Sequence, residues 1–491
     1  MIDKEFVVGL DLGTTNVKAL LFSLTGQVIA EKEERVETIF LEGEGAEQDA
    51  REVETKALNC LRGIIQESKK RSGKIVAIGL SCAMHSLIFV EERLEPLGNM
   101  LLWSDGRAAE KAEELLQDVG REIYSRTGTP IHPMNPFVKL CWLQKQKPAL
   151  LNNAAFIMTM KDYLVSRWFG NRYIDYSMAA SMGLFNLNTY DWDEEALAFV
   201  NIKREKLSTP VPPHFVLPEL RREIATEIGL ERNIPFVIGA ADGQLANLGS
   251  GAIAETDVAI SVGTSGAVRK FINGTALDDK MRTFCYPFTK ETTIIGGPTN
   301  NGGIVLQWLK EILGIAEDFA AFLEMANQVP PGSEGVLFLP YINGERAPLW
   351  KQVAKGTFFG LNVSHQKEHL IRAALEGISF NLYQIAQTLP AGNTGEETIL
   401  VSGGFARSRV WLQILADIFG KRIALPTTPQ SSAWGAAWCA LVGIGKVADF
   451  HEIKKHIVIS DVIEPDRERH ETYKERYALY EKLCKDVQRY F

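Results

Sequence analysis

One short pattern occurs twice in the sequence, and its residue types suit the binding of an anion. Asp11-Leu12-Gly13-Thr14-Thr15 follows the apolar run 6–10, and Ser261-Val262-Gly263-Thr264-Ser265 follows the apolar run 258–260. Each segment predicts a strand, a tight turn and a returning strand. Glycine at such a turn permits positive φ and lets backbone N–H groups approach an anion, while the hydroxyls add donors. Two matched hairpins, one opening each half, predict two pseudo-equivalent lobes that hold one polyphosphate through Gly13, Thr14, Thr15, Gly263 and Thr264.

Asp242 follows the apolar run 236–241 and precedes a helical pattern. An aspartate there is often only a helix N-cap. However, ligands of α/β sheets bind beyond the carboxyl ends of strands, and a helix N-terminus favours the ionised carboxylate. Phosphoryl transfer needs only late proton acceptance, which an ionised aspartate can supply. We therefore predict that Asp242 is a general base.

Asp11 directly precedes the first turn, and two interpretations of it stay open. An aspartate at a strand end commonly forms an Asx turn. It could also hold the water shell of a Mg²⁺ that bridges phosphates, because Mg²⁺ binds few carboxylates and keeps its waters. Lys18, on the returning strand, is interpreted as a strand-face lysine.

Glycine pairs in the second half suit a flat nucleoside. Gly403-Gly404 follows the apolar strand 399–402, and Asn300-Asn301-Gly302-Gly303 precedes a helical pattern. Glycines after strands are routine, so each pair alone is weak evidence. The chain has neither G-x-x-x-x-G-K-[ST] nor G-x-G-x-x-G, which disfavours P-loop and Rossmann folds.

A second polar cluster lies in the first half, in Ala83-Met84-His85-Ser86 and Trp103-Ser104-Asp105-Gly106-Arg107. An indole face with nearby donors and acceptors suits a polyol. Taken singly, the tryptophan would usually be core, the arginine a salt-bridge residue and the histidine a satisfied polar group. Together they predict a sugar pocket that includes Asp105 and Arg107.

Bulk properties exclude several classes of protein. At 491 residues the chain is long enough for two to four domains, and its net charge of −8 disfavours a nucleic-acid surface and a polybasic membrane patch. No stretch has the composition of a membrane span, and the first residues do not resemble a secretory signal. The six scattered cysteines indicate buried, reduced thiols. We expect a cytoplasmic protein with neither nucleic-acid nor membrane partners.

Strand and helix patterns alternate along the chain, which indicates an α/β architecture. We divide it into lobes 1–249 and 250–491. The predicted elements are a helix over 51–71, a strand over 75–80, an ordered loop over 127–136, a helix over 137–145, a proline-rich connector over 210–218, a strand over 236–238, a helix start over 300–308, a strand over 399–402 and a surface helix over 466–490.

Two longer motifs resemble those of the FGGY carbohydrate kinases, in the actin-like, ribonuclease-H-like ATPase superfamily. The first spans Met134-Asn135-Pro136-Phe137-Val138-Lys139-Leu140-Cys141-Trp142-Leu143. The second is Gly356-Thr357-Phe358-Phe359-Gly360-Leu361, followed by His369-Leu370 and Ala373-Ala374-Leu375-Glu376. Both motifs are specific and occur in the family's order, and the resemblance covers nearly the whole chain.

The resemblance implies two actin-like lobes around a hinged cleft, with ATP and Mg²⁺ as cofactors and a sugar or sugar acid as substrate. It also implies a homodimer, the common assembly in the family. The site residues it implies are Thr14 and Thr264 for the phosphates, Gly303, Gln307, Gly404 and Ser408 for adenosine, Met84, His85, Trp103 and Met134 for the sugar, and Asp242 as the base.

Within the family, Met84-His85 stands where glycerol kinases carry an Arg-Glu pair. Ala83 and Ser86 stand where xylulokinases usually have Gln and Gly, and with the segment 128–134 this makes the sequence most like gluconokinase. Gly243 replaces an amide side chain that touches the sugar in several relatives. Phosphorylation of D-gluconate to 6-phosphogluconate is thus our expectation, with D-xylulose as the alternative.

A gluconate carboxylate needs a cation or several N–H donors. Arg107, Lys139, His85 and His132 are the candidates that the sequence offers, but neutral-sugar kinases have similar residues.

A rival hypothesis from another class is a non-catalytic actin-like nucleotide-binding protein, such as a filament, a chaperone or a sugar-responsive regulator. A chaperone would usually add a peptide-binding domain, for which the chain has little room. Asp242, both hairpins and both motifs favour the enzyme.

Overall fold

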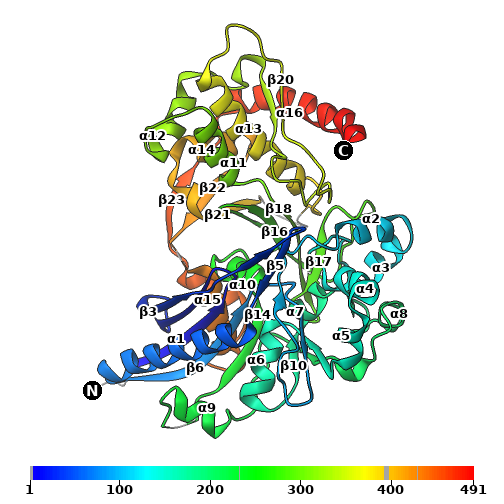
Figure 1. Cartoon of the computed structure of the whole chain (residues 1–491). Helices are drawn as coiled ribbons and strands as arrows, with labels where there is room; N and C mark the ends of the chain where they lie inside the picture. The colour runs from blue at the N-terminus through cyan, green and yellow to red at the C-terminus, as the bar shows by residue number, and fades with distance from the viewer. Residues whose placement is uncertain (1–3, 232, 392–396, 428–429) are drawn as a thin grey trace.

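The protein folds into two α/β lobes, an N-terminal lobe drawn below a C-terminal lobe in Figure 1. The computed structural model describes residues 4–231, 233–391, 397–427 and 430–491. Each lobe is built on one mixed sheet, and each predicted hairpin supplies two neighbouring antiparallel strands of its sheet. The predicted α/β class is confirmed.

The N-terminal sheet has the order β14-β6-β1-β2-β3. Its strands are β14 (Phe236–Ala241), β6 (Gly73–Cys82), β1 (Lys4–Leu12), β2 (Asn16–Ser23) and β3 (Val28–Arg35). The pairs β1–β2 and β2–β3 are antiparallel, whereas β1–β6 and β6–β14 are parallel. The carboxyl ends of β1, β6 and β14 therefore meet at one edge of the sheet.

The C-terminal sheet repeats this arrangement, with the order β17-β18-β16-β15-β21-β22-β23. Its strands are β17 (Phe284–Pro287), β18 (Thr292–Thr299), β16 (Gly266–Asn273), β15 (Asp257–Val262), β21 (Thr398–Ser402), β22 (Ile423–Pro426) and β23 (Ile459–Ile463). From β18 to β22 the pairings run antiparallel, antiparallel, parallel and parallel. Because β3 to β14 follow the same sequence of pairings, the two lobes are pseudo-equivalent, as the paired hairpins predict.

Two helices sandwich the N-terminal sheet. On α1 (Ala50–Lys70), Val53, Ala57, Leu61 and Ile64 recur at helical spacing and are buried, and the Asp49 side chain caps the first turn. The helix α15 (Ser431–Gly443) contacts β1, β6 and β14, although it lies far along the chain. It lies beside α10 (Asp242–Gly249) in the lower lobe of Figure 1.

The helix α15 lies close to the sheet and to α10 because a glycine of each faces it, Gly79 of β6 and Gly249 of α10. A Cβ at Gly79 would lie 1.9 Å from the Ala436 carbonyl oxygen, and one at Gly249 would lie 1.9 Å from that of Ser431. Only a residue without a side chain permits these backbone approaches. A segment that lies between two strands of the C-terminal sheet in the chain, β22 and β23, thus completes the core of the N-terminal lobe.

Between β6 and β14 the chain forms a largely helical insertion. Its helices are α2 (Ala109–Gln117), α3 (Gly120–Thr127), α4 (Pro136–Gln146), α5 (Pro148–Asn153), α6 (Met160–Phe169), α7 (Tyr176–Ser181), α8 (Glu194–Phe199) and α9 (Arg222–Glu227). Its short strands are β7 (Ile88–Val90), β8 (Met100–Leu101), β9 (Phe156–Met158), β10 (Tyr173–Asp175), β11 (Phe185–Asn186), β12 (Asp191–Trp192) and β13 (Thr209–Val211). Two further short strands, β4 (Ile39–Leu41) and β5 (Gly45–Gln48), precede β6 in the chain.

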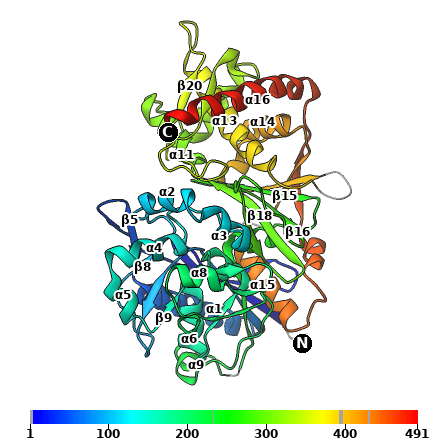
Figure 2. The ribbon, with the colours of Figure 1, turned by 90° about the vertical axis from the view of Figure 1, so that its right-hand side faces the viewer.

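Further helices cover the C-terminal sheet, and Figure 2 shows them above β15, β16 and β18. These helices are α11 (Gly303–Ile312), α12 (Phe319–Glu324), α13 (Lys367–Ala386), α14 (Arg409–Phe419) and α16 (Arg467–Val487), with the short strands β19 (Leu337–Leu339) and β20 (Thr357–Phe359). The tail helix α16 lies on the surface as predicted, but it also buries Tyr473, Tyr480 and Cys484 against the lobe.

The other predicted elements are also found, with boundaries shifted by a few residues. The helix predicted over 51–71 is α1 and the one over 137–145 is α4, while the strands predicted over 75–80, 236–238 and 399–402 are β6, β14 and β21. The connector 210–218 is less irregular than expected, because it begins within β13.

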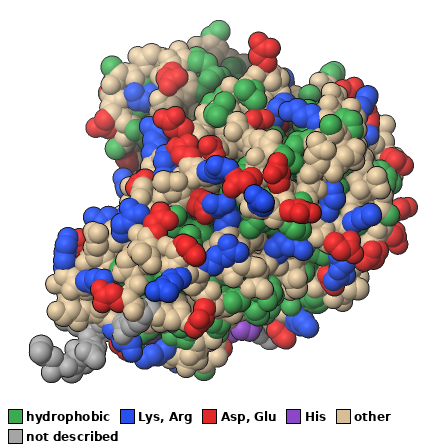
Figure 3. Space-filling view, turned by 60° about the horizontal axis from the view of Figure 1, so that its bottom comes forward, with side chains coloured by type: hydrophobic (Ala, Val, Ile, Leu, Met, Phe, Trp, Pro, Cys, Tyr) green, Lys and Arg blue, Asp and Glu red, His purple; other side chains and the backbone are tan. Residues whose placement is uncertain are grey.

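The surface and the thiols agree with the composition. Acidic and basic side chains intermingle over the face shown in Figure 3. All six cysteines are buried as free thiols. Among the helices of the described residues, none combines the length and apolarity that crossing a bilayer requires.

Candidate active site

Three neighbouring cavities lie around the two hairpins. The inner cavity, of about 360 Å³, is lined by residues of both lobes: Thr14, Ala83, Met84, His85, Trp103, Met134, Asp242, Ser261, Gly263, Thr264, Ser265, Gly266, Ala267, Arg269, Phe284, Tyr286, Pro298 and Arg346. The C-lobe cavity, of about 730 Å³, is lined by Gly263, Thr264, Gly303, Ile304, Gln307, Phe319, Ala320, Leu323, Glu324, Gly404, Phe405, Arg407, Ser408 and Trp411. Both cavities share Gly263 and Thr264, so the turn of the second hairpin separates them.

The first hairpin meets the inner cavity through Thr14. The Gly13 N–H donates to the Asn16 carbonyl at 3.1 Å and closes the turn. The Thr14 hydroxyl accepts from the Trp103 indole N–H at 3.1 Å. Thr15 is exposed and lines an outer cavity of about 590 Å³, which also reaches Trp103, Asp105, His132, Thr264 and Arg346.

The second hairpin carries the start of α11 on its turn. The Gly303 N–H donates to the Gly263 carbonyl at 2.8 Å, and the Ile304 N–H donates to the Thr264 carbonyl at 3.1 Å. A Cβ at Gly302 would lie 2.7 Å from the Ser265 carbonyl oxygen, so glycine permits this approach. These two N–H groups are committed to the turn and hold the start of α11 against it, which places the positive end of the helix dipole beside the Gly-Thr turn.

Beyond the turn, the predicted adenosine residues line one cavity. Gly403 adopts φ +98°, and a Cβ there would lie 2.3 Å from the Val262 carbonyl oxygen, whereas nothing lies within 4 Å of a Cβ at Gly404. Gly404 thus presents bare backbone to the C-lobe cavity, which Gln307 and Ser408 also line.

Asp242 lines the inner cavity at the end of β14. It is the first residue of α10, and Ala241 is the residue at the cap. Its carboxylate accepts the Gly243 N–H at 2.7 Å. Burial raises the pKa of Asp242, and the charges of Arg269 and Lys161 oppose that rise. The pure N-cap interpretation does not describe this carboxylate, which faces a cavity.

Asp11 lies across β1–β6 from Ser81, whose hydroxyl donates to the Asp11 carboxylate at 2.6 Å. Burial raises the pKa of Asp11 to about 6, and the negative charge of Asp242 adds to the rise. The Gly13 N–H, which an Asx turn at Asp11 would use, donates to Asn16 instead. The two carboxylates thus lie close enough to influence each other at one edge of the sheet.

The predicted sugar residues Met84, His85, Trp103 and Met134 all line the inner cavity. His85 has φ +65°, and its Nδ1–H donates to the Ser181 carbonyl at 2.8 Å. Burial lowers the pKa of His85 to about 3. The ring is therefore neutral near pH 7 and keeps Nε2 as an acceptor for a hydroxyl.

Asp105 and Arg107 bind each other rather than one shared ligand. The Arg107 guanidinium is paired with Asp105 and with Glu47, the latter at 2.7 Å, and it lies over the Trp142 ring. Asp105 lines the outer cavity, whereas Arg107 is outside the described linings of all three.

Two further carboxylate-binding candidates are also occupied or neutral. The Lys139 ammonium donates to the carbonyls of Leu102 and Met134, and burial lowers the pKa of Lys139 to about 7. His132 Nδ1 accepts the Met134 N–H at 3.2 Å, and burial holds the pKa of His132 well below its usual range. With Arg107 paired and His85 neutral, none of the four candidates offers a free cation.

Sequence reasoning missed two arginines that line the inner cavity. Arg269 lies on β16, donates to the Ser261 hydroxyl at 3.2 Å, and leaves its Nε buried without a hydrogen-bond partner. Arg346 lies over the Trp103 ring, donates to the Thr299 carbonyl at 3.1 Å, and also leaves its Nε unpartnered. The sequence did contain a signal for each arginine. Arg269 is a charged residue within the apolar returning strand of the second hairpin, and Arg346 follows Gly344-Glu345 in a turn.

The lining of the inner cavity is therefore cationic. Two arginines, Arg269 and Arg346, and one carboxylate, Asp242, are the charged side chains among its lining residues. Burial lowers the pKa of Arg346 only to about 10, so this side chain stays charged near neutral pH. A cavity of this charge favours an anionic ligand.

Known proteins share both the sequence and the fold. Family models for the N- and C-terminal domains of the FGGY family of carbohydrate kinases match residues 6–249 and 258–444. A gluconokinase of Bacillus subtilis is 39% identical over 92% of this chain and 90% of its own length. A xylulose kinase of Staphylococcus epidermidis is 29% identical over 99% of this chain and 97% of its own length.

Two crystal structures from Lactobacillus acidophilus superimpose closely. One, described as a ligand-bound xylulose kinase, has a TM-score of 0.95 at 34% identity and covers 99% of this chain and 98% of its own. The other, described as a gluconate kinase, has a TM-score of 0.94 at 34% identity and covers 98% of both chains. The fold is thus that of the two-lobed, actin-like sugar kinases, which confirms the expected architecture. The chain belongs to the FGGY family of carbohydrate kinases. The division at 249/250 remains our proposal beside the family boundaries.

Proposed function

We propose that this carbohydrate kinase is a gluconokinase, which transfers the γ-phosphoryl group of Mg·ATP to the terminal hydroxyl of D-gluconate and yields 6-phosphogluconate and ADP. The observation that carries the choice of sugar acid is the pair of arginines on the inner cavity, Arg269 and Arg346. The gluconokinase relatives at 38–39% identity favour the same substrate.

The Arg269 guanidinium lies where a side chain at position 243 would begin. A Cβ at Gly243 would lie 3.0 Å from the Arg269 Nε and 3.2 Å from its Cζ. By the family resemblance, several relatives carry a sugar-contacting amide at that position. Here glycine leaves room for a guanidinium, so a neutral contact to the sugar is replaced by a positive one. A planar guanidinium binds a carboxylate with two parallel hydrogen bonds, which supports recognition of an aldonate.

The cavities on either side of the second hairpin support a position for the nucleotide. Adenosine fits the C-lobe cavity between Gly404, Ser408 and Gln307, with its phosphates passing the Gly263-Thr264 turn toward Asp242. Thr14, on the opposite lobe, contacts the phosphates from the other side. The γ-phosphoryl group then reaches the inner cavity, where the sugar lies.

Asp242 acts on the sugar hydroxyl in this arrangement. As the hydroxyl oxygen bonds to the γ-phosphorus, the bond from phosphorus to the bridging oxygen breaks and ADP leaves. Asp242 accepts the hydroxyl proton late in this step, because the transition state is loose. His85, with a free Nε2 acceptor, orients another hydroxyl of the sugar.

The site fits Mg²⁺ held mostly by phosphates and water. In the described part of the chain, no group of three or more His, Cys, Asp or Glu side chains could hold a metal alone. Mg²⁺ commonly uses few carboxylates and supplies neutralisation of charge on the β- and γ-phosphates. Asp11, at the same sheet edge as Asp242 and oriented by Ser81, would hold the ion through its water shell.

Xylulose phosphorylation is the second candidate, because a structure described as a xylulose kinase has a TM-score of 0.95. ADP release should be measured with gluconate, gluconamide, glucitol and xylulose, beside a blank without sugar. Gluconamide and glucitol retain the terminal hydroxyl of gluconate and lack the negative charge. We expect gluconate to give the highest kcat/KM, with the product phosphorylated at C6 by NMR.

Turnover of xylulose above gluconate would overturn the choice of substrate and keep the family's phosphotransfer. Equal turnover of gluconate and gluconamide would show that the arginines do not read the carboxylate. Tight ATP binding by calorimetry, with no sugar-stimulated ADP release from any of the four compounds, would instead favour the non-catalytic hypothesis.

A further inference from the structure

A buried ion pair lies behind the candidate base, outside the three cavities described. Lys161 of α6 and Asp175 at the end of β10 are both fully buried, and Lys161 Nζ lies 2.7 Å from Asp175 Oδ2. A buried ion pair is often no more stabilising than a well-packed apolar pair, because both charges lose water. The other hydrogen bonds of this pair indicate what it does.

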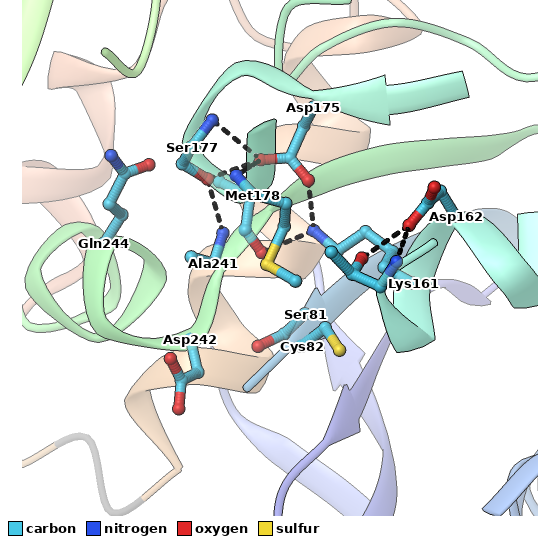
Figure 4. Close-up of polar contacts among 12 residues, drawn as sticks. Ser81, Cys82, Lys161, Asp162, Asp175, Ser177, Met178, Ala241, Asp242 and Gln244 are labelled. Carbon is cyan, nitrogen blue, oxygen red and sulfur yellow. Dashed lines mark hydrogen bonds and ion pairs between the residues drawn. The ribbon is translucent and has the colours of Figure 1, made fainter. Parts of the chain in front are cut away.

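Those hydrogen bonds converge on one peptide group. Lys161 Nζ donates to the Ala240 carbonyl at 2.6 Å. Asp175 accepts from the Ser177 hydroxyl, and that hydroxyl in turn accepts the Ala241 N–H at 2.8 Å. The Ala240 carbonyl and the Ala241 N–H belong to the same peptide bond, so the network holds both polar ends of one plane (Figure 4).

The sheet alone does not fix this peptide. β14 is the outermost strand of the sheet, and its register with β6 shifts between Val237 and Ala240. The outward backbone of its first half bonds to the segment 213–217, and the last of these hydrogen bonds is the one from the Gly239 N–H to the Pro213 carbonyl. Within that irregularity Gly239 adopts φ +64°, and a Cβ there would lie 1.8 Å from the Leu80 carbonyl oxygen. An edge strand leaves outward backbone groups without a strand partner. Beyond Gly239, Lys161 and Ser177 supply the partners of the Ala240 carbonyl and the Ala241 N–H, next to Asp242.

Asp242 itself points away from Lys161 and Asp175 in Figure 4, so the network acts on its backbone. The helix that Asp242 begins is held at two other points. The Gln244 amide donates to the Tyr286 carbonyl at 3.1 Å, and the Ser432 hydroxyl donates to the Asp242 carbonyl at 3.2 Å. The Ala240–Ala241 peptide, which lies one peptide bond before that of Asp242, is a third point at which the backbone around the base is held.

We propose that Lys161, Asp175 and Ser177 are positioning residues, which fix the Ala240–Ala241 peptide and thereby aim the Asp242 carboxylate at the sugar hydroxyl. The proposal rests on Asp242 as the base, and it is independent of which sugar is phosphorylated. A displacement of about 1 Å at a reacting group can lower a rate about 100-fold, so loss of one contact in this network is expected to reduce kcat.

Ser177→Ala tests this with the smallest change, since it removes the hydroxyl between Asp175 and the Ala241 N–H. Ser166→Ala is the matched control. Ser166 is a buried serine on the same helix as Lys161, and its hydroxyl donates within that helix to the Asp162 carbonyl at 2.6 Å. Kinetics are measured with the sugar that the substrate panel selects. We expect Ser177→Ala to lower kcat about tenfold with both KM values within about twofold, and Ser166→Ala to leave kcat unchanged.

A double-mutant cycle with Asp242→Asn separates positioning from general loosening of the fold. If Ser177 acts through the base, Ser177→Ala should lower the residual rate of Asp242→Asn by less than about twofold, because no base remains to be aimed. A further tenfold loss in that background would overturn the proposal, as would equal effects of Ser177→Ala and Ser166→Ala. Full turnover by Asp242→Asn alone would refute the base and the positioning role together.

Discussion

The substitution Arg269→Met tests most directly why the inner cavity is cationic. Methionine retains much of the length of the arginine side chain and removes its charge and donors. Arg269 leaves its Nε unpartnered and covers the space above Gly243, so a substrate carboxylate would find an available guanidinium there. We expect the variant to lose activity toward the acid and to keep it toward neutral analogues.

The magnitude follows from the charge of the contact. A hydrogen bond to a charged group contributes about 1.5–3 kcal/mol, and loss of one partner of a desolvated charge pair costs about 2–5 kcal/mol. A value of about 3 kcal/mol corresponds to a fall of about 100-fold in kcat/KM for gluconate. For gluconamide and glucitol, which carry no carboxylate, we expect a fall of less than about fivefold.

The assay is ADP release at pH 8, for a reason that the structure supplies. The charge of Arg269 opposes the rise in the pKa of Asp242, so its removal shifts ionisation of the base to higher pH. An assay at pH 8 favours the ionised carboxylate in both proteins more than an assay at lower pH does, which reduces that contribution. Arg204→Met, which removes an exposed guanidinium paired with Asp191, serves as the control. An equal fall for gluconate and gluconamide would refute carboxylate recognition and assign Arg269 to phosphoryl transfer.

Three further predictions concern Asp242, Asp11 and the glycines at the C-lobe cavity. Asp242→Asn should lower kcat by about 10²–10⁴-fold while calorimetry shows that ATP binding is retained, and full turnover by this variant would refute the role of Asp242. In the wild-type protein, the acid limb of the kcat/KM profile should lie above pH 3.8, because burial raises the pKa of Asp242. Burial raises the pKa of Asp11 from 3.8 to about 6, so between these pH values the folded protein binds more protons at Asp11 than the unfolded protein does. Ionised Asp11 therefore lowers the free energy of unfolding by at most about 3 kcal/mol, an effect that is complete above pH 6 and fades toward pH 4. Asp11→Asn should thus raise the Tm of ligand-free protein at pH 8 more than at pH 4.5 by calorimetry, and lower kcat; an equal gain at both pH values would contradict this reasoning. Gly404→Ala should raise KM for ATP several-fold without changing Tm, whereas Gly403→Ala should lower Tm because its Cβ would meet the Val262 carbonyl oxygen. A lower Tm with an unchanged KM for ATP in Gly404→Ala would show that adenosine does not lie against Gly404.

Local features were predictable from the sequence where a few neighbouring residues determine them. A Gly-Thr turn between two apolar runs specifies its own hairpin, and both hairpins form as expected. Met84, His85, Trp103 and Met134 meet in one cavity, as the family motifs imply. The division into two lobes followed from the same repeat, since each hairpin supplies two neighbouring strands of an equivalent set of pairings.

Electrostatic assignments failed where they depended on distant partners. Arg107 looked like a carboxylate ligand in its local segment, but Glu47 and Asp105 pair with it in the fold. Lys139 carries a charge in sequence, yet its ammonium is committed to two backbone carbonyls. Whether a charged side chain is free or already paired depends on segments that only folding brings to it.

The sequence by itself therefore determined the family, the two lobes, the two Gly-Thr hairpins and the candidate base, because each rests on short segments with strong local preferences. Only the tertiary structure decided which cations line the inner cavity, that α15 returns to cover the N-terminal sheet, and that Lys161 holds the Ala240 carbonyl. Such contacts join residues far apart in the chain, for example Lys161 with Ala240, 79 positions apart, and Gly9 with Ala433, 424 positions apart. Packing sets their distance and the direction of their side chains, which no local pattern in a single sequence specifies.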